Sequence, residues 1–363
     1  MVIEDHPEGD PLEEAWTAPS SWYTSPEVAA KERDTVFART WQLVAREDQL
    51  RAAGDYVTAE VAGEPLVVVR GKDGVLRGFF NVCRHHAAAV MTEPCGNAAR
   101  LRCPYHGWTY GLDGALLSVT EFEGARKFHL TDNGLVSVEV SAWQGLVFVR
   151  IERPPSSASS SFADEISPVL GHVAGMGEEA SGLLAQADLV FLERRSWDFE
   201  CNWKVFVDNY LDGGYHIPFL HRELNQVIDF QRYAIDNLGR SCLQSSPVDP
   251  SAAGALRAGH ALYLWVYPNL MLNAYAGYLD TNLVLPIDQD RTRVVFDFYA
   301  TPGSDHRESI ELAYRIQNED VAICASVQRG LKSRAYDRGR LSPRREAGEH
   351  LFHRLLAKDL LGR

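Results

Sequence analysis

Hydrophobic and polar positions follow two different patterns of spacing along the chain, one typical of strands and one typical of helices. Between Trp41 and Ile151 the apolar residues fall in short runs separated by Gly and Asp turns, a pattern that predicts short β-strands. Three of these runs are Tyr56–Thr58, Pro65–Val69 and Gly145–Ile151. The pattern predicts a small all-β module in this part of the chain.

Helical spacing occurs outside that module. Residues from Val28 to about Trp41 set charged positions against apolar ones, which predicts a helix. The second half of the chain contains both strand-type and helical spacing and is therefore predicted to be α+β with an antiparallel sheet. We expect strands at Leu192–Asn202, Leu262–Ala274, Leu279–Leu285 and Thr292–Ala300, and helices from Trp203 to about Gly213 and from Ser309 to about Lys332.

A stretch of proline and serine, Pro154–Ser161, separates the two parts and has the composition of a linker or surface loop. We place a domain boundary there. The length of 363 residues agrees with two domains, since one common domain has roughly 150 residues. With 45% hydrophobic and 23% charged residues, the composition is that of a globular protein with a substantial core.

Charge narrows the classes of partner. The 49 acidic residues outnumber the 36 basic ones and give a formal net charge of −13, which argues against nucleic acid and against anionic membranes as main partners. No apolar stretch reaches the roughly 20 residues that span a bilayer. Met1–Glu14 lacks the features of a targeting peptide, so we expect a cytoplasmic location.

Two short motifs each offer one thiol and one imidazole. They are Cys83-x-His85 and Cys103-x-x-His106, with 17 residues between His85 and Cys103. A structural zinc site would more often group Cys with Cys and His with His. Mixed pairs suit a [2Fe–2S] cluster in which two cysteines hold one iron and two histidines hold the other.

The residues around these motifs fit a cluster. Gly107–Gly111 supplies a tight turn and bulky aromatic cover for one flank. His86 faces away from His85 if the backbone there is extended, and we interpret it as a neighbour and not a ligand. We interpret the remaining cysteines as ordinary reduced thiols; they are Cys95, Cys201, Cys242 and Cys324.

A second group of metal-ligand residues lies on the predicted helix after Asn202. Asp208 and Asp212 are four residues apart, so both carboxylates share one helix face. Continuing that row by four residues reaches His216, although Gly213–Gly214 loosens the turn there.

His221 follows His216 by five residues and returns to the same point in space only if the chain bends at Pro218. Two histidines in an aromatic-rich stretch are as often a packed, hydrogen-bonded pair as a pair of metal ligands. A carboxylate from another element would decide between these interpretations.

Asp320 interrupts the apolar row of the last predicted helix. An acid in a buried stripe needs a partner, either a buried arginine or a metal. We predict that Asp320 joins His216 and His221 in a two-histidine, one-carboxylate set that leaves positions open on Fe(II). Glu319 lies about 100° round the helix and is the weaker candidate. The apolar row is Ile316, Ile323, Cys324, Val327 and Leu331.

Asn81–His85 together with Cys103–Trp108 resembles the Rieske domain of ring-hydroxylating-type oxygenases. The resemblance extends along nearly the whole chain and is closest to choline monooxygenase and its quaternary-amine relatives. The segments that carry this closer resemblance are Cys83–Ala87, Asp208–His216, Tyr267–Asn269, Asp280–Pro286, Ser326–Leu331, Ala335–Asp337 and Phe352–His353.

The resemblance implies a fold and a division of the chain. It implies an all-β Rieske [2Fe–2S] domain at 41–153 and a helix-grip catalytic domain, an antiparallel sheet with helices that binds mononuclear non-heme iron, at 154–363. Residues 1–40 are then the N-terminal part of the catalytic domain. The chain is expected to be the oxygenase component, built as a homotrimer or a multiple of three.

The resemblance also implies how electrons reach the cluster. A reductase or ferredoxin that obtains its electrons from NAD(P)H would reduce the cluster held by Cys83, His85, Cys103 and His106. Because cooperating clusters and irons of such enzymes belong to neighbouring subunits, a carboxylate is implied as the bridge between them. Asp212, four residues before His216, is assigned that role, with Asp208 as runner-up. For Asn209 two interpretations stay open, a position near the iron and, as the favoured one, a capping or packing role.

The implied reaction uses O2 to oxidise a small substrate, and a quaternary ammonium substrate requires a box of aromatic rings. Asn273–Tyr278 departs from the choline monooxygenase pattern, so a betaine, carnitine or an N-demethylation stays open. An aromatic-ring dioxygenase, an O-demethylase and a non-catalytic Rieske carrier are the alternatives. The aromatics available for a box, each of which could instead be core, are Tyr210, Tyr215, Trp265, Tyr267, Tyr275 and Tyr278.

Overall fold

The computed structural model describes residues 3–7, 9–153, 161–184, 188–226, 228–248 and 259–362. Two compact units make up the chain, one at Phe37–Asp164 and one that combines Met1–Val36 with Glu165–Arg363. Most of the predicted Pro/Ser linker, residues 154–160, lies outside the described residues. None of the described helices is long and apolar enough to cross a lipid bilayer.

The smaller unit is built almost entirely of strands, as the alternation predicts. Its described strands form an antiparallel sheet in the order β1-β10-β9-β4-β3-β2-β5 and a small sheet β6-β7-β8. These strands are β1 Gln42–Arg46, β2 Asp55–Val61, β3 Glu64–Arg70, β4 Leu76–Phe80, β5 Cys95–Asn97, β6 Leu101–Arg102, β7 Thr109–Tyr110, β8 Leu116–Ser118, β9 Ser137–Trp143 and β10 Leu146–Arg150. Short helical segments accompany them at η1 Phe37–Arg39, η2 Glu47–Gln49, η3 Leu130–Asp132 and α3 Phe162–Glu165.

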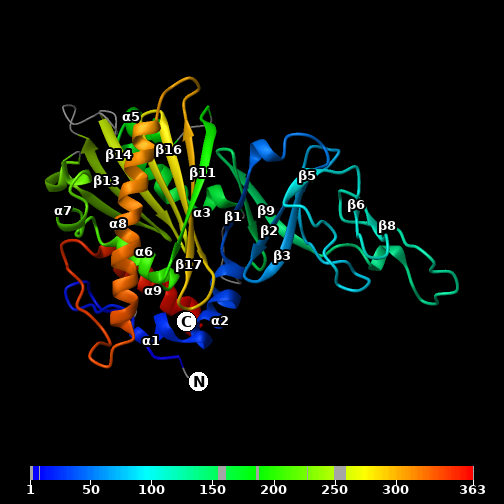
Figure 1. Ribbon diagram of the computed structural model, residues 1–363, viewed down its shortest axis with the longest axis horizontal. Coiled ribbons are helices and arrows are strands. Elements are labelled where there is room, and N and C mark those ends of the chain that lie inside the picture. The colour runs from blue at the N-terminus through cyan, green and yellow to red at the C-terminus, as the bar shows by residue number, and fades with distance from the viewer. Residues whose placement is uncertain are drawn as a thin grey trace. The chain divides into compact units, whose positions relative to one another are not determined.

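The larger unit contains an antiparallel sheet in the order β11-β17-β16-β15-β14-β13-β12, counted over the described strands. Figure 1 shows helix α8, in orange, lying across one face of this sheet. The strands are β11 Val190–Phe199, β12 Ala234–Leu238, β13 Ser241–Val248, β14 Gly259–Val266, β15 Leu270–Tyr275, β16 Tyr278–Pro286 and β17 Thr292–Ala300. The helical segments are α1 Ser20–Thr24, α2 Pro26–Thr35, α4 Ser167–Gly175, α5 Glu178–Leu184, α6 Trp203–Leu211, α7 Ile217–Leu220, η4 Leu224–Gln226, η5 Phe230–Arg232, α8 Arg307–Leu331 and α9 Ala347–Leu361.

Two predicted elements have different bounds. The helix predicted from Val28 to about Trp41 is α2, which ends at Thr35. It begins at Pro26, because the Ser25 side chain accepts hydrogen bonds from the backbone N–H groups of Glu27 and Val28. The single strand predicted at Leu262–Ala274 is two strands, β14 and β15. The chain turns between them at Pro268, which cannot donate to a strand ladder.

The buried side of α8 also differs from the predicted apolar row. Ile323 is 39% exposed and Val327 is 45% exposed. Polar Gln317 and Gln328 are buried together with Asp320 and Cys324. Asp320 is therefore one of several buried polar residues, and the expectation that it alone interrupts an apolar stripe is wrong.

A buried ion pair ties α2 to α6. The ammonium group of Lys204 lies 2.6 Å from a carboxylate oxygen of Glu32, and both side chains are almost fully buried. The indole N–H of Trp203 donates to the other oxygen of Glu32 at 2.8 Å. This contact fixes the start of α6, the helix that leads into the second predicted site.

Candidate active site

The loop after α6 positions the first histidine. The helix ends at Leu211, and Gly213 and Gly214 adopt positive φ angles of 67° and 69°, so the predicted helical row does not continue to His216. A Cβ atom on Gly213 would clash with the backbone carbonyl of Arg345, which leaves room for glycine only.

Between the two histidines the chain turns through α7, a single helical turn that contains the predicted bend residue Pro218. Pro218 lies in the first turn of α7, a position that tolerates proline because no intrahelical N–H bond is lost there. Gly213 and Gly214 precede His216, so it is the turn of α7 that brings His221 back to His216.

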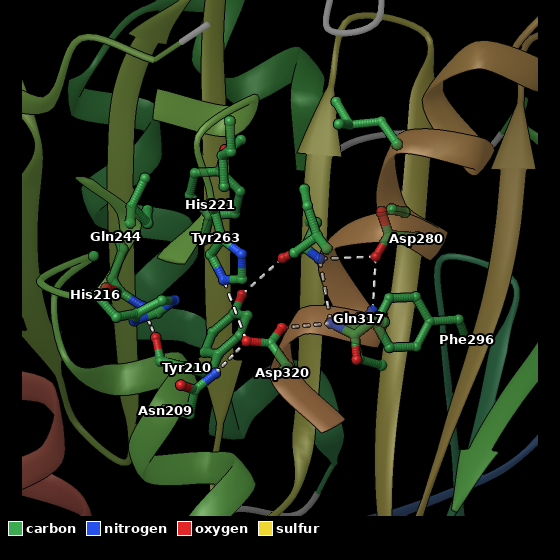
Figure 2. A pocket seen from close by; sticks show the side chains of 18 of the residues that line it. Asn209, Tyr210, His216, His221, Gln244, Tyr263, Asp280, Phe296, Gln317 and Asp320 are labelled. Atoms are coloured by element: carbon green, nitrogen blue, oxygen red, sulfur yellow. Dashed lines mark hydrogen bonds and ion pairs between the residues drawn. The ribbon is translucent and has the colours of Figure 1, made fainter. Parts of the chain in front are cut away.

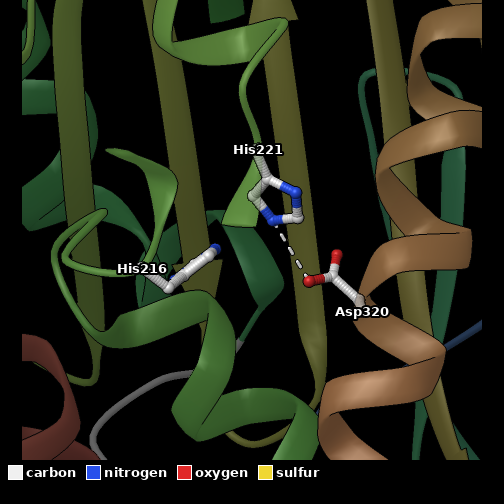
Figure 3. Close-up of side chains that lie close together, drawn as sticks. All are labelled: His216, His221 and Asp320. Carbon is white, nitrogen blue, oxygen red and sulfur yellow. Dashed lines mark ion pairs between the residues drawn. The ribbon is translucent and has the colours of Figure 1, made fainter. Parts of the chain in front are cut away.

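His216, His221 and Asp320 come together, as predicted. Each offers one ligand atom, and these atoms lie within 4.8 Å of one another (Figure 3). His221 Nε2 lies 3.2 Å from an oxygen of Asp320, and both side chains are buried. Two imidazoles and one carboxylate converging from two elements can hold one metal ion and leave coordination positions open.

Two carboxylates contact the Nδ1 atoms of the two histidines. Asp212 lies 2.6 Å from His216 Nδ1, and Glu319 lies 2.7 Å from His221 Nδ1. Each contact leaves the Nε2 atom of the ring for a metal. The interpretation of Glu319 as a weaker alternative ligand missed this role, which its place beside Asp320 could have indicated.

The carboxylate of Asp320 is itself held by two amides. Asn209 Nδ2 donates to one oxygen at 3.0 Å, and Gln317 Nε2 donates to the other at 3.2 Å. The only ion pair of Asp320 among the described residues is with His221, so it is not a salt bridge to a buried arginine. Asn209 therefore lies beside the candidate metal centre, the less favoured of its two interpretations, and Gln317, one turn before Asp320, was missed.

Asp208 and Asp212 have different partners despite their shared helix face. Asp208 accepts a hydrogen bond from the Tyr23 hydroxyl at 2.6 Å and lies 3.0 Å from His353 Nε2. The Ala18 N–H donates to His353 Nδ1, so the neutral ring carries its proton on Nε2 and donates it to Asp208. Among these contacts, only Asp212 reaches a histidine of the candidate metal centre.

The four predicted cluster ligands meet at one place in the smaller unit. Cys83 and Cys103 are buried together in its core. His85 Nδ1 and His106 Nδ1 lie 3.2 Å apart at the more exposed side. Partial burial and the neighbouring imidazoles lower the pKa of His85, which favours the neutral form that binds metals.

The surroundings of this group match one expectation and correct another. Trp108 is buried, and its ring stacks on His85 with centroids 4.7 Å apart, so it supplies the predicted aromatic cover. His86 does not face away from His85, because the backbone forms a turn and the two rings lie 4.1 Å apart. Tyr110 OH lies 3.4 Å from Cys83 Sγ, close enough to hydrogen-bond to the sulfur.

A cavity of about 120 Å³ adjoins the His216/His221/Asp320 group (Figure 2). Of the proposed aromatic box, Tyr210, Tyr275 and Tyr278 line it. Four further rings in the lining were missed: Phe206, Tyr233, Tyr263 and Phe296. The other box candidates lie elsewhere: Trp265 and Tyr267 are buried outside the lining, and Tyr215 is 49% exposed.

Comparison with known proteins agrees with this geometry. The family description "Rieske [2Fe-2S] domain" matches residues 40–129, and "Ring hydroxylating alpha subunit (catalytic domain)" matches residues 187–361. Choline monooxygenase of Arabidopsis thaliana, described as chloroplastic, is 38% identical over 96% of this chain and 84% of its own. The chain belongs to the Rieske oxygenases, as an alpha subunit.

Two further relatives of this Rieske oxygenase bear on its chemistry. The carnitine monooxygenase oxygenase subunit of Escherichia coli K12 is 32% identical over 95% of this chain and 94% of its own. A solved quaternary ammonium Rieske monooxygenase, described in terms of carnitine oxidation and inter-subunit electron transfer, matches with a TM-score of 0.84 and 28% identity. The match covers 99% of this chain and 100% of that one.

A Rieske oxygenase of this kind uses a [2Fe–2S] cluster and a mononuclear iron, and both groups fit the side chains present. Two buried thiols opposite two imidazole Nδ1 atoms form the mixed donor set of a Rieske cluster. Two imidazoles and a carboxylate within 4.8 Å form the donor set of a mononuclear Fe(II) centre.

Proposed function

We propose that this Rieske oxygenase uses O2 to oxidise a small quaternary amine of the choline or betaine type, by monooxygenation or by N-demethylation. The proposal rests on the several tyrosines that line the cavity beside His216, His221 and Asp320. A methylated ammonium group cannot donate hydrogen bonds, so ring faces and dispersion contacts are what can hold it. The choline and carnitine monooxygenases among the relatives support the same substrate class.

We assign the mononuclear Fe(II) to His216, His221 and Asp320. We assign the cluster to Cys83, His85, Cys103 and His106. When bound, these groups supply single-electron transfer and O2 activation.

The chain's own side chains supply orientation and shelter. Asp212 and Glu319 fix the two imidazoles through Nδ1, and Asn209 and Gln317 fix Asp320. The burial of His221 and Asp320 keeps bulk water from the site, while the tyrosine rings hold the substrate beside it.

We further propose that electrons reach the iron from the cluster of a neighbouring subunit through Asp212, in a homotrimer or a multiple of three. Asp212 contacts His216 and keeps part of its side chain exposed, so a group from outside the chain can reach it. A reductase or ferredoxin fed by NAD(P)H is the proposed donor. The relative described in terms of inter-subunit electron transfer supports this route.

For the domains we propose residues 1–40 and 154–363 as the catalytic domain and 41–153 as the Rieske domain. The two compact units and the two family matches support these boundaries. The cytoplasmic location stays a prediction.

The test follows O2 uptake and product together. Purified holoenzyme with a compatible reductase and NADH is given choline, glycine betaine, carnitine or naphthalene, with Asp320→Ala as the inactive control. We expect uptake coupled to an oxidised or demethylated amine. A dihydrodiol or phenol from naphthalene, with no amine product, would instead identify an aromatic-ring oxygenase.

A further inference from the structure

The cavity contains a carboxyl group that the metal centre does not use. Asp280, on β16, lines the cavity and is 3% exposed. Its Oδ1 atom accepts hydrogen bonds from Asn273 Nδ2 at 2.8 Å and from Asn282 Nδ2 at 2.7 Å (Figure 2). No described residue donates a hydrogen bond to its other oxygen, Oδ2.

No lysine or arginine occurs among the described residues that line this cavity. Burying a carboxylate costs free energy unless a cation or several donors compensate it, and here two amides share one oxygen. The remaining oxygen is thus available to a positively charged ligand. The adjacent rings of Tyr275 and Tyr278, with centroids 5.9 Å apart, supply faces for the same cation.

We propose that Asp280 is the counter-ion of the substrate's ammonium group, and that the cavity selects amines with a single positive charge over zwitterions. This inference rests on the proposed function and narrows it. A betaine or carnitine brings its own carboxylate, which would lie in a cavity whose described lining offers it no basic side chain and already contains Asp280. Choline-like alcohols and other cationic amines lack that carboxylate.

The same geometry links binding to proton release. Burial raises the pKa of Asp280 to about 7, against the opposing effect of its two asparagine hydrogen bonds. A bound cation favours the ionised form, so binding at neutral pH releases a proton, and affinity rises as the pH increases through about 7. In an Asp280→Asn variant this pH dependence of the affinity should disappear.

The other titratable groups near Asp280 do not produce this effect. Tyr210 on α6, Tyr263 on β14, Tyr275 on β15 and Tyr278 on β16 are buried tyrosines whose pKa values are raised, so they stay neutral. The metal-site groups His216, His221 and Asp320 line the same cavity. Measurements on iron-loaded protein keep these three in one protonation state.

The experiment is titration calorimetry on the holoenzyme, in two buffers that differ in ionisation enthalpy. The ligands are choline, its neutral carbon isostere and glycine betaine. We expect choline to bind wild-type protein about tenfold more tightly, or better, than either comparison ligand, with proton release. Asp280→Asn should lose the preference for choline over the isostere and the proton release.

Asp297→Asn is the matched control. Asp297 is a buried acid on the neighbouring strand β17 that pairs with Arg194 outside the cavity lining, so its replacement should keep the preference. The comparison of choline with its isostere in wild-type protein requires no variant and stands even if a variant folds poorly.

Three results overturn the inference. They are equal affinity of wild-type protein for choline and its isostere, glycine betaine binding as tightly as choline, and an unchanged choline preference in Asp280→Asn. The proposed function survives all three if a quaternary amine is still oxidised. If wild-type protein neither binds nor oxidises any of the amines, the proposed function itself fails.

Discussion

Glu319 and His221 are joined by a 2.7 Å contact at the ring's Nδ1 atom, while Nε2 of the same ring lies 3.2 Å from Asp320. Neighbouring residues of α8 thus contact opposite nitrogens of one imidazole. One carboxylate orients the ring and the other completes the set of candidate ligands.

Replacing Glu319 tests this orientation. Glu319→Gln should weaken the affinity for the mononuclear iron by about 10- to 100-fold, because the imidazole loses the anion that fixes its tautomer. Competition with a chelator measures that affinity, while the cluster absorbance should not change. Glu308→Gln, an exposed acid on the same helix, is the control. Equal iron affinity in both variants would show that Glu319 has no orienting role.

Iron affinity should also depend on pH. In the iron-free protein burial tends to lower the pKa of His221, but hydrogen bonds with Asp320 and Glu319 outweigh it and raise the pKa. Iron must therefore displace a proton, and its apparent affinity should fall about tenfold per unit as the pH drops below that raised pKa. Chelator competition at several pH values measures the slope. A flat profile would contradict the protonated state of His221.

Replacing Asp212 and Asp208 one at a time tests the proposed route of the electrons. Asp212→Asn should leave the cluster spectrum and the iron content intact while slowing substrate-dependent cluster reoxidation by about 100-fold or more, because Asp212 contacts His216. Stopped-flow absorbance measures this rate. Asp208→Asn changes a carboxylate bonded to Tyr23 and His353 and should keep the rate. The reverse pattern would make Asp208 the bridge.

The buried Lys204–Glu32 pair should matter for stability. Lys204→Met leaves Glu32 buried without its cation and should lower the free energy of unfolding by about 3–5 kcal/mol. Urea denaturation followed by tryptophan fluorescence measures the change. The exposed pair of Arg293 and Asp198 provides the contrast, since Arg293→Met should not change the unfolding midpoint measurably. Similar losses of unfolding free energy in both variants would show that burial does not determine how much an ion pair contributes to stability.

The sequence was most informative where the ligand residues of a site lie close together along the chain. Each Cys-His motif lies within one loop, so backbone geometry alone brings its thiol and imidazole together. The approach of Asp320 to His216 and His221 was predictable from an acid at a buried helical position, although Ile323 and Val327 proved exposed. A helical period shows which residues share a face, but not which face is covered.

The cavity was predictable only in part, because its walls depend on register between strands distant along the chain. Tyr263 and Asp280 approach the same space from β14 and β16. Alternation within one strand cannot show which residues of another strand lie opposite. The need for glycine at position 213 likewise becomes clear only from the close approach of the Arg345 backbone. A tertiary contact, not local propensity, decides where that loop turns.

The role of His216, His221 and Asp320 is tested by returning iron to iron-depleted protein whose cluster is intact. Fe(II) is titrated in, the cluster is reduced, and choline oxidation is measured in a single turnover with O2. The product should rise in proportion to added iron and level off at about one iron per chain, and Asp320→Ala should give none. Product that does not depend on this iron, or an Asp320→Ala variant that still oxidises the amine, would show that these three residues do not hold the catalytic iron.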